Sequence, residues 1–184
     1  MSRILGIDPG SRITGYGIVE SAERGRVSHI TSGTLRLGEG EVPARLATLF
    51  DGLTALIDEY RPTWVAVEQV FLYRNPDTAL KLGQARGVAL CAVARAGLAV
   101  HEYTPAEIKQ ALTGKGNAAK QQVGHMVTAL LALREAPAED AADALAAALC
   151  HLHLSQTASR LGALPSRRRG GRGKARKAWS ALER

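Results

Sequence analysis

The 184-residue sequence has few cysteines, few aromatic residues and no long apolar run. Cys91 and Cys150 lie in alanine-rich stretches typical of helices, so both are predicted to be small buried side chains rather than a disulfide. No run approaches the length needed to span a bilayer, and a strand-like segment stands where a signal peptide would lie. We therefore expect a cytoplasmic protein with no membrane association.

The common nucleotide-binding motifs are also absent. There is no G-x-x-x-x-G-K-[ST] loop and no G-x-G-x-x-G after a strand-like segment, and "GKGN" at 114–117 is too short for either. These absences argue against a nucleotide cofactor, and no organic cofactor is expected.

Positive charge is concentrated at the C-terminal end. Nine of the 24 Lys and Arg residues, but one of the 17 Asp and Glu residues, lie in 160–184, so 1–159 is nearly neutral. The stretch "PSRRRGGRGKARK" is rich in Gly and Arg and poor in large apolar side chains, which is typical of disorder. We therefore predict one domain at 1–159 and a basic, disordered tail at 160–184, which serves either nucleic-acid binding or solubility alone.

The apolar pattern predicts an α/β domain. Three strands separated by turn residues indicate an antiparallel meander, and each of the next two strands follows a long helical pattern, as in parallel crossovers. The strands are expected at 3–8, 13–20, 26–37, 64–68 and 98–103, and the helices at 43–60, 77–96, 105–112, 118–133 and 138–159. The prediction is a five-stranded mixed sheet flanked by helices.

Four acidic residues occur in unusually apolar surroundings. Asp8 ends the first strand, Glu68 ends "WVAVE", and Asp140 and Asp143 lie in "AEDAADALAAALC". A sheltered carboxylate needs a cation, and two carboxylates three residues apart on a helix repel each other, so something positive should lie between them. If the first and fourth strands are parallel neighbours, all four carboxylates converge.

An oxygen-only donor set without a convincing Cys or His cluster predicts Mg²⁺, with Mn²⁺ as a substitute. Two such ions at one site catalyse in-line attack on phosphodiesters, so we expect two ions. Any one of these carboxylates could instead cap a helix or form an ion pair. His151, in "CHLH", shares no helix face with His153 and is interpreted as an ordinary helix residue. It lies on the side of Ala144 and Ala147, so an approach to the site from that side stays open.

The segments "LGIDPGSRITGYGIV", "VAVEQVF", "NPDTALKLGQARGVAL" and "EDAADALAAALCHLHLSQ" resemble the RuvC family of bacterial Holliday junction resolvases, in order and spacing over 3–157. The resemblance implies a ribonuclease-H-like fold, a homodimer, and Mg²⁺-dependent paired nicking of two like-polarity strands at a four-way DNA junction, in recombination and repair. It also makes the branch-migration proteins RuvA and RuvB expected partners. The arginine-rich extension is longer and more basic than the family pattern.

The resemblance also assigns roles to single residues. Asp8, Glu68, Asp140 and Asp143 match the family's catalytic metal ligands. Phe71 matches an aromatic at the junction, and Lys109 and Lys120 match basic positions associated with DNA contact, although each lysine could be a solvated helix residue. The helix containing Gly83 and Gly87 resembles the dimer-forming helix.

Three alternatives remain open from the sequence. An ATPase of the actin, Hsp70 and sugar-kinase fold shares a similar first hairpin, but 184 residues are short for its two lobes. A smaller ribonuclease-H-like nuclease could act on RNA instead of junction DNA. A non-catalytic protein could bind DNA through its basic tail alone.

Overall fold

The first three strands form the expected antiparallel meander, and the last two are parallel to the first. In the computed structural model, which describes residues 2–22, 26–69 and 75–160, the sheet order is β3-β2-β1-β4-β5. The strands are β1 (Ser2–Asp8), β2 (Ile13–Ser21), β3 (Val27–Arg36), β4 (Trp64–Glu68) and β5 (Val100–Tyr103). β1 pairs in parallel with β4, and β4 with β5. The mixed α/β prediction is confirmed.

Two helices make the crossovers and cover one face of the sheet. They are α1 (Val42–Tyr60), between β3 and β4, and α2 (Pro76–Arg95), between β4 and β5. Their apolar sides pack on the residues of β1, β2 and β4 that point to this face, such as Leu5, Ile18 and Val67. The Asn75 side chain caps α2 by accepting hydrogen bonds from two backbone N–H groups of its first turn.

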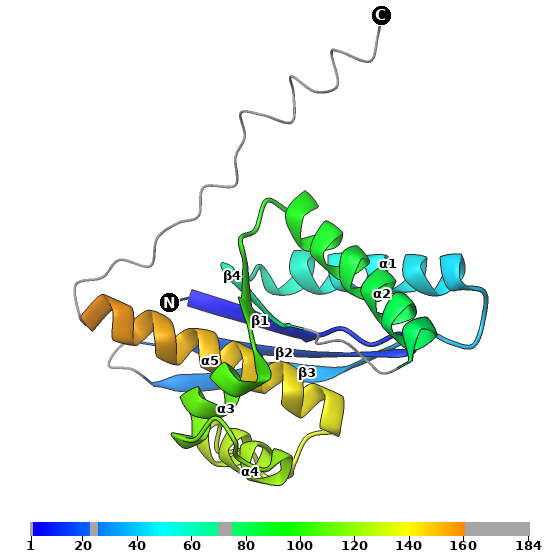
Figure 1. Ribbon diagram of the computed structural model, residues 1–184. Helices are drawn as coiled ribbons and strands as arrows, with labels where there is room; N and C mark the ends of the chain where they lie inside the picture. The colour runs from blue at the N-terminus through cyan, green and yellow to red at the C-terminus, as the bar shows by residue number, and fades with distance from the viewer. Residues whose placement is uncertain (1, 23–25, 70–74, 161–184) are drawn as a thin grey trace, which may run out of the picture.

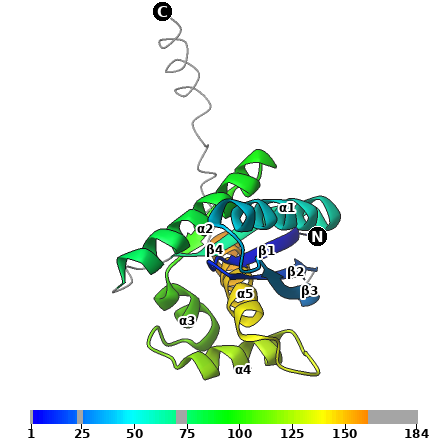
Figure 2. The ribbon, with the colours of Figure 1, turned by 90° about the vertical axis from the view of Figure 1, so that its right-hand side faces the viewer.

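The opposite face is covered by α5 (Glu139–Arg160), with α3 (Pro105–Thr113) and α4 (Lys120–Leu130) packed outside it. Figure 1 shows α5 running along the sheet, and Figure 2 shows the resulting layers, with α1 and α2 above the strands and α5 below them. Residues 144–150 of α5 are all buried. Small side chains dominate this run, so the helix can approach the strands closely.

Two glycines allow that close approach. A Cβ atom on Gly6 of β1 would lie 1.9 Å from the carbonyl oxygen of Ala144, and one on Gly15 of β2 would lie 1.9 Å from that of Asp140. Real Cβ atoms essentially never come this close to another atom. The backbone of α5 therefore rests directly on the backbone of the sheet, at Asp140 and again one turn later at Ala144.

The cysteine prediction is half correct. Cys150 is buried in α5, but Cys91 is exposed on α2. The alanine-rich sequence around Cys91 indicates a helix correctly, yet the exposed face of α2 also carries small side chains, so composition could not distinguish its two sides. Among the described residues, no helix has both the length and the apolar character needed to cross a membrane.

Candidate active site

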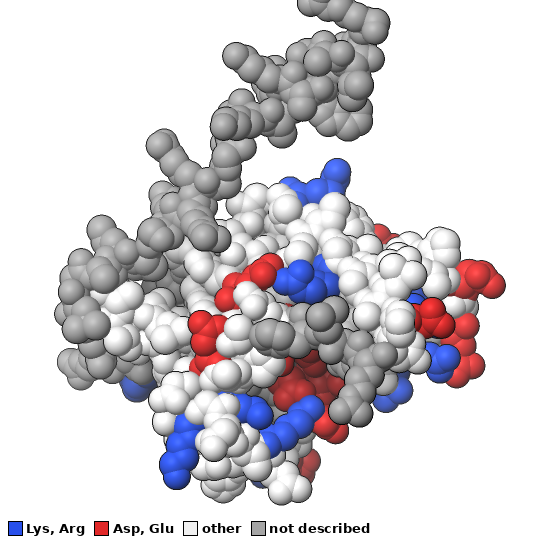
Figure 3. Space-filling model, viewed as in Figure 1, with Lys and Arg blue, Asp and Glu red and all other residues white. Residues whose placement is uncertain are grey.

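The four carboxylates singled out in the sequence line one pocket of about 530 Å³. Asp8 comes from the end of β1, Glu68 from the end of β4, and Asp140 and Asp143 from the start of α5. Figure 3 shows acidic side chains gathered in a hollow near the middle of one face. The expected convergence of the four residues is present.

The sheet topology explains why Asp8 and Glu68 meet. β1 and β4 are parallel neighbours with Ile7 opposite Val67, so the next residue of each strand lies at the same edge of the sheet. Helix α5 begins over this edge. Because Gly15 has no side chain, the backbone of Asp140 can lie directly against β2. Side chains from three segments distant in the sequence thereby share one pocket.

The turn between β1 and β2 forms another wall of the pocket, with Pro9, Gly10 and Ser11. The buried Thr14 hydroxyl is 3.2 Å from both the N–H and the carbonyl oxygen of Gly10. The Arg45 guanidinium of α1 donates a hydrogen bond to the carbonyl of Ser11, and the N–H of Leu37 donates to that of Arg12. The turn is therefore held from within, from α1 and from the end of β3.

The carboxylates raise one another's proton affinity. Burial, followed by the charges of Glu68, Asp143 and Asp140, raises the pKa of Asp8 to about 7. Burial is also the largest cause of the raised pKa of Glu68 and of Asp143. Asp8 therefore keeps a proton at a pH where an ordinary carboxyl group would have lost it.

Lys120, the first residue of α4, supplies positive charge inside this pocket. Its Nζ lies 2.7 Å from Oδ2 of Asp143 and 2.7 Å from Oε1 of Glu139. Burial opposes the charged form, but hydrogen bonds to Asp143 and Glu139 outweigh it, and the pKa of Lys120 is raised. Lys120 therefore places one positive charge on Asp143, and the expectation of a cation between Asp140 and Asp143 stays a prediction.

The donor set fits a hard divalent cation. Four carboxylates face one pocket, and an ammonium group already occupies a cation position on Asp143. As the side chains stand, no group of three or more His, Cys, Asp or Glu in the described part of the chain is arranged to hold a metal ion. The pocket carboxylates therefore lie near one another without being arranged as a ligand cluster. Their role as metal ligands stays a prediction.

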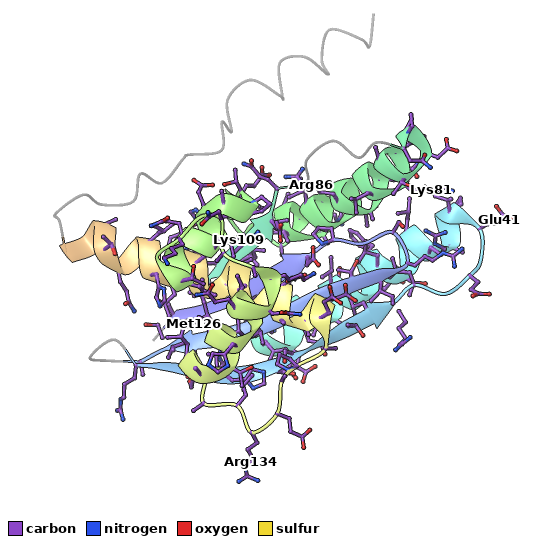
Figure 4. All side chains as sticks on the ribbon, turned by 60° about the horizontal axis from the view of Figure 1, so that its bottom comes forward. Glu41, Lys81, Arg86, Lys109, Met126 and Arg134 are labelled. Atoms are coloured by element: carbon purple, nitrogen blue, oxygen red, sulfur yellow. The ribbon has the colours of Figure 1, made fainter. Side chains whose placement is uncertain are left out.

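Lys109 and His151, also singled out from the sequence, do not line this pocket. Lys109 is half-buried on α3 (Figure 4), and its charge lowers the pKa of Glu68 against the larger effect of burial. Phe71 lies outside the described residues.

His151 is buried in α5. Its Nδ1 is hydrogen-bonded to the Tyr103 hydroxyl at 2.7 Å, and the centroid of its ring lies 4.3 Å from that of His101. Burial, followed by the charge of His101, lowers the pKa of His151 to about 4, so this side chain is uncharged at neutral pH.

Sequence analysis did not identify three residues that shape the site. Glu139 shares the Lys120 ammonium with Asp143, Arg45 holds the β1–β2 turn, and Gly15 seats α5 on the sheet. The glycines that alternate through "GYG" in a strand are a usable signal, because a strand interior disfavours glycine unless another backbone approaches it. The partners of Glu139 and Arg45 depend on tertiary packing and have no local signal.

The mixed sheet and the carboxylate-lined pocket at its edge define the class, an α/β protein of ribonuclease-H-like fold with four acidic residues in one pocket. The family model for crossover junction endodeoxyribonuclease RuvC matches residues 4–151. The chain belongs to the RuvC family.

Relatives described as crossover junction endodeoxyribonuclease RuvC include one from Alkalilimnicola ehrlichii, 61% identical over 88% of this chain and 97% of the relative. Another, from Halorhodospira halophila, is 64% identical over 83% of this chain and 91% of the relative.

Solved structures agree with this assignment. The structure described as T. thermophilus RuvC in complex with Holliday junction substrate has a TM-score of 0.80 and 34% identity, covering 89% of this chain and 98% of that one. The yeast mitochondrial Holliday junction resolvase Ydc2, at a TM-score of 0.64 and 15% identity, covers 86% of this chain and 82% of its own and shares the fold.

Proposed function

We propose that this protein is a divalent-metal-dependent endonuclease that resolves four-way DNA junctions by paired nicks in two strands of like polarity. The observation that carries the proposal is the convergence of Asp8, Glu68, Asp140 and Asp143 on one pocket, in a chain of the RuvC family. The activity is hydrolysis of a phosphodiester bond, in DNA recombination and repair. The solved complex of a relative with a Holliday junction supports the choice of substrate.

The four carboxylates are the residues that would hold Mg²⁺, or Mn²⁺ in its place. Bound divalent ions supply an activated water and stabilise the leaving oxygen, and two ions are expected. The protein contributes a pocket open to solvent on one side and fixed by the sheet edge, α5 and the clamped β1–β2 turn. Asp8 is half-buried, and the charges of all three other carboxylates act on it, so its substitution should affect the site most.

The DNA backbone needs positive charge beside this acidic pocket. Lys120 lines the pocket, and Lys109 is close enough to act on Glu68. Lys and Arg side chains also lie beside the acidic hollow on the side of α3 and α4 (Figure 3). We propose that Lys109 and Lys120 contact phosphates flanking the cut. Stacking of Phe71 on a base at the branch point remains a prediction from the family pattern.

A cleavage gel tests the proposal. Full-length protein is incubated with an end-labelled mobile four-way junction and with the matching linear duplex, in Mg²⁺ and in EDTA. We expect nicks at symmetric positions in the junction only, and only with the metal. Cleavage of structured RNA in preference to the junction would favour the RNA-nuclease alternative, and metal-independent binding without nicking would favour a DNA-binding protein. Binding of ATP, measured by calorimetry, would favour the ATPase.

The exposed face of α2 supports a homodimer. Leu80 is 63% exposed, a Cβ on Gly83 or Gly87 would meet nothing within 4 Å, and Cys91 is exposed on the same helix. Small side chains allow close helix packing, and a two-fold dimer presents two identical sites to a pseudo-two-fold junction. We propose that two copies pair through this face of α2. RuvA and RuvB as partners, and a cytoplasmic location, remain predictions.

A bulky charge on this face should separate the two copies. Gly87→Arg leaves the fold of one chain intact because the position is open, but we expect its mass by analytical ultracentrifugation to fall from twice 19.5 kDa to 19.5 kDa. Paired nicking should then be replaced by slow single nicks. Gly124→Arg on α4 is the matched control, since a Cβ there also meets nothing within 4 Å. A Gly87→Arg variant that remains dimeric would rule out this interface.

We propose that 1–159 is the nuclease domain and that 160–184 is a basic arm for DNA. Deleting 163–184 removes eight Lys and Arg residues, so we expect weaker junction binding at low salt and a shallower slope of log Kd against log salt. Deleting 178–184 is the control, because it removes only Glu183 and Arg184 among charged residues. An unchanged salt slope in the longer deletion would show that the arm does not contact DNA.

A further inference from the structure

Lys120 lies between two carboxylates that belong to different parts of the site. Its Nζ is 2.7 Å from Oδ2 of Asp143, which lines the pocket, and 2.7 Å from Oε1 of Glu139, which does not. The Asp143 side chain is 22% exposed, whereas that of Glu139 is 75% exposed. The ammonium thus joins an inner carboxylate at the pocket to an outer one in solvent.

This ammonium offsets the charge of the whole cluster. Lys120 is the only Lys or Arg among the described residues that line the pocket, together with Asp8, Glu68, Asp140 and Asp143. Its charge lowers the pKa of Asp8, Glu68 and Asp143 against the larger effect of burial. One ammonium facing four carboxylates leaves an excess of acidic groups, whose charge a divalent ion can neutralise.

We propose that Lys120 is the counter-ion of the metal-free pocket, that a divalent cation displaces it from Asp143, and that Glu139 retains the displaced ammonium at the mouth of the pocket. The inference rests on the proposed function in one respect, which is that Asp143 is a metal ligand. Glu139 is a positioning residue in this scheme, because it acts through Lys120.

The exchange follows from the geometry at Asp143. An ammonium 2.7 Å from Oδ2 blocks the approach of a cation to that oxygen and repels any cation bound nearby. Glu139, at the first residue of α5, already holds the same ammonium. Lys120 can therefore leave Asp143 without returning fully to water. It then presents its charge at the side of the pocket where a phosphate would enter.

Calorimetric titration of MgCl₂ into the full-length protein, without DNA, tests the exchange. Lys120→Met removes the competing cation, so we expect Mg²⁺ to bind about three- to fivefold more tightly, a size typical of a partly exposed ion pair. Lys115→Met removes an exposed lysine from the loop between α3 and α4, and we expect it to bind Mg²⁺ like the wild type. Unchanged affinity in Lys120→Met would overturn the inference.

Glu139 provides a second, independent test. Glu139→Gln removes the outer acceptor, so we expect Mg²⁺ to bind about threefold more weakly in the presence of Lys120. In the Lys120→Met background the same substitution should have little effect, because there is no ammonium to retain. An equal loss in both backgrounds would mean that Glu139 attracts the metal directly, and the positioning role would be wrong.

The carboxylate variants separate this inference from the proposed function. Asp8→Asn and Asp143→Asn should each lose most Mg²⁺ binding in the same titration. If both retain it, the carboxylates do not hold the metal and the proposed function fails. If both lose it while Lys120→Met equals the wild type, the metal site stands and the counter-ion role alone is wrong.

Discussion

Replacing Asp8 with asparagine is expected to abolish nicking of the four-way junction, with a loss of at least about 1,000-fold, while junction binding stays equal or becomes tighter. The substitution removes a metal ligand from the proposed site, and an electrostatic contribution of several kcal/mol to the transition state is lost with it. It also removes one negative charge that faces the DNA phosphates. Repulsion between the pocket and the DNA is therefore reduced, and the affinity for the junction does not fall. Nicking kinetics and a gel-shift assay in Ca²⁺ measure the two effects separately.

The same variant should be more stable than the wild type when metal is absent. Burial and the neighbouring carboxylates raise the pKa of Asp8 from 3.8 to about 7, so the folded state binds this proton more tightly than the unfolded chain does. Wild-type stability therefore falls as pH rises from about 4 to about 7, and Asp8→Asn lacks that loss. Above pH 7 in EDTA, we expect about 2 kcal/mol of added stability, or a Tm higher by about 4–8 °C.

Asp51→Asn is the matched control, because Asp51 is exposed on α1 and lies outside the pocket. It should change neither nicking nor the dependence of Tm on pH. Near wild-type, Mg²⁺-dependent nicking by Asp8→Asn would contradict the carboxylate site. A lower Tm for Asp8→Asn above pH 7 would contradict the repulsion within the pocket.

Gly15→Ala is expected to have the second largest effect, a fall in nicking of about 100-fold or more with a lower Tm. The added Cβ would lie 1.9 Å from the carbonyl oxygen of Asp140, and this atom belongs to helix backbone and cannot rotate away. The start of α5 must then move off β2 and carry its carboxylates with it. A displacement of about 1 Å in a catalytic group can cost 100-fold in rate.

Two further alanine variants give this prediction its controls. Gly6→Ala creates the same 1.9 Å contact with Ala144, one turn further along α5, so it should lower Tm with a smaller loss of nicking. Gly40→Ala, in the connection between β3 and α1, is placed where nothing lies within 4 Å and should leave both unchanged. Tm is measured by calorimetry and nicking at saturating Mg²⁺. Wild-type activity in Gly15→Ala would mean that α5 does not need this contact.

The sequence predicts most of the fold and the identity of the pocket carboxylates, because both depend on local pattern. Apolar alternation places Asp8 and Glu68 at the ends of two strands, and helical spacing puts Asp140 and Asp143 on one side of a helix. The ion pairs of Lys120 could not be predicted, since they depend on how α4 meets α5 across a connection of eight residues, 131–138. The exposure of Cys91 depends on which side of α2 faces the sheet, and alanine-rich composition does not show that.

The backbone contacts of α5 with Gly6 and Gly15 restrict how far this helix can move when DNA binds. A helix that touches the sheet backbone to backbone cannot tilt or slide to suit a substrate without opening a gap or a clash. The backbone positions that carry the carboxylates of α5 and of the strands are therefore fixed relative to one another. We therefore expect adjustment during binding to fall on the branched DNA. Selectivity for a junction can then arise from the cost of deforming DNA, which is low at a branch point and high in an intact duplex.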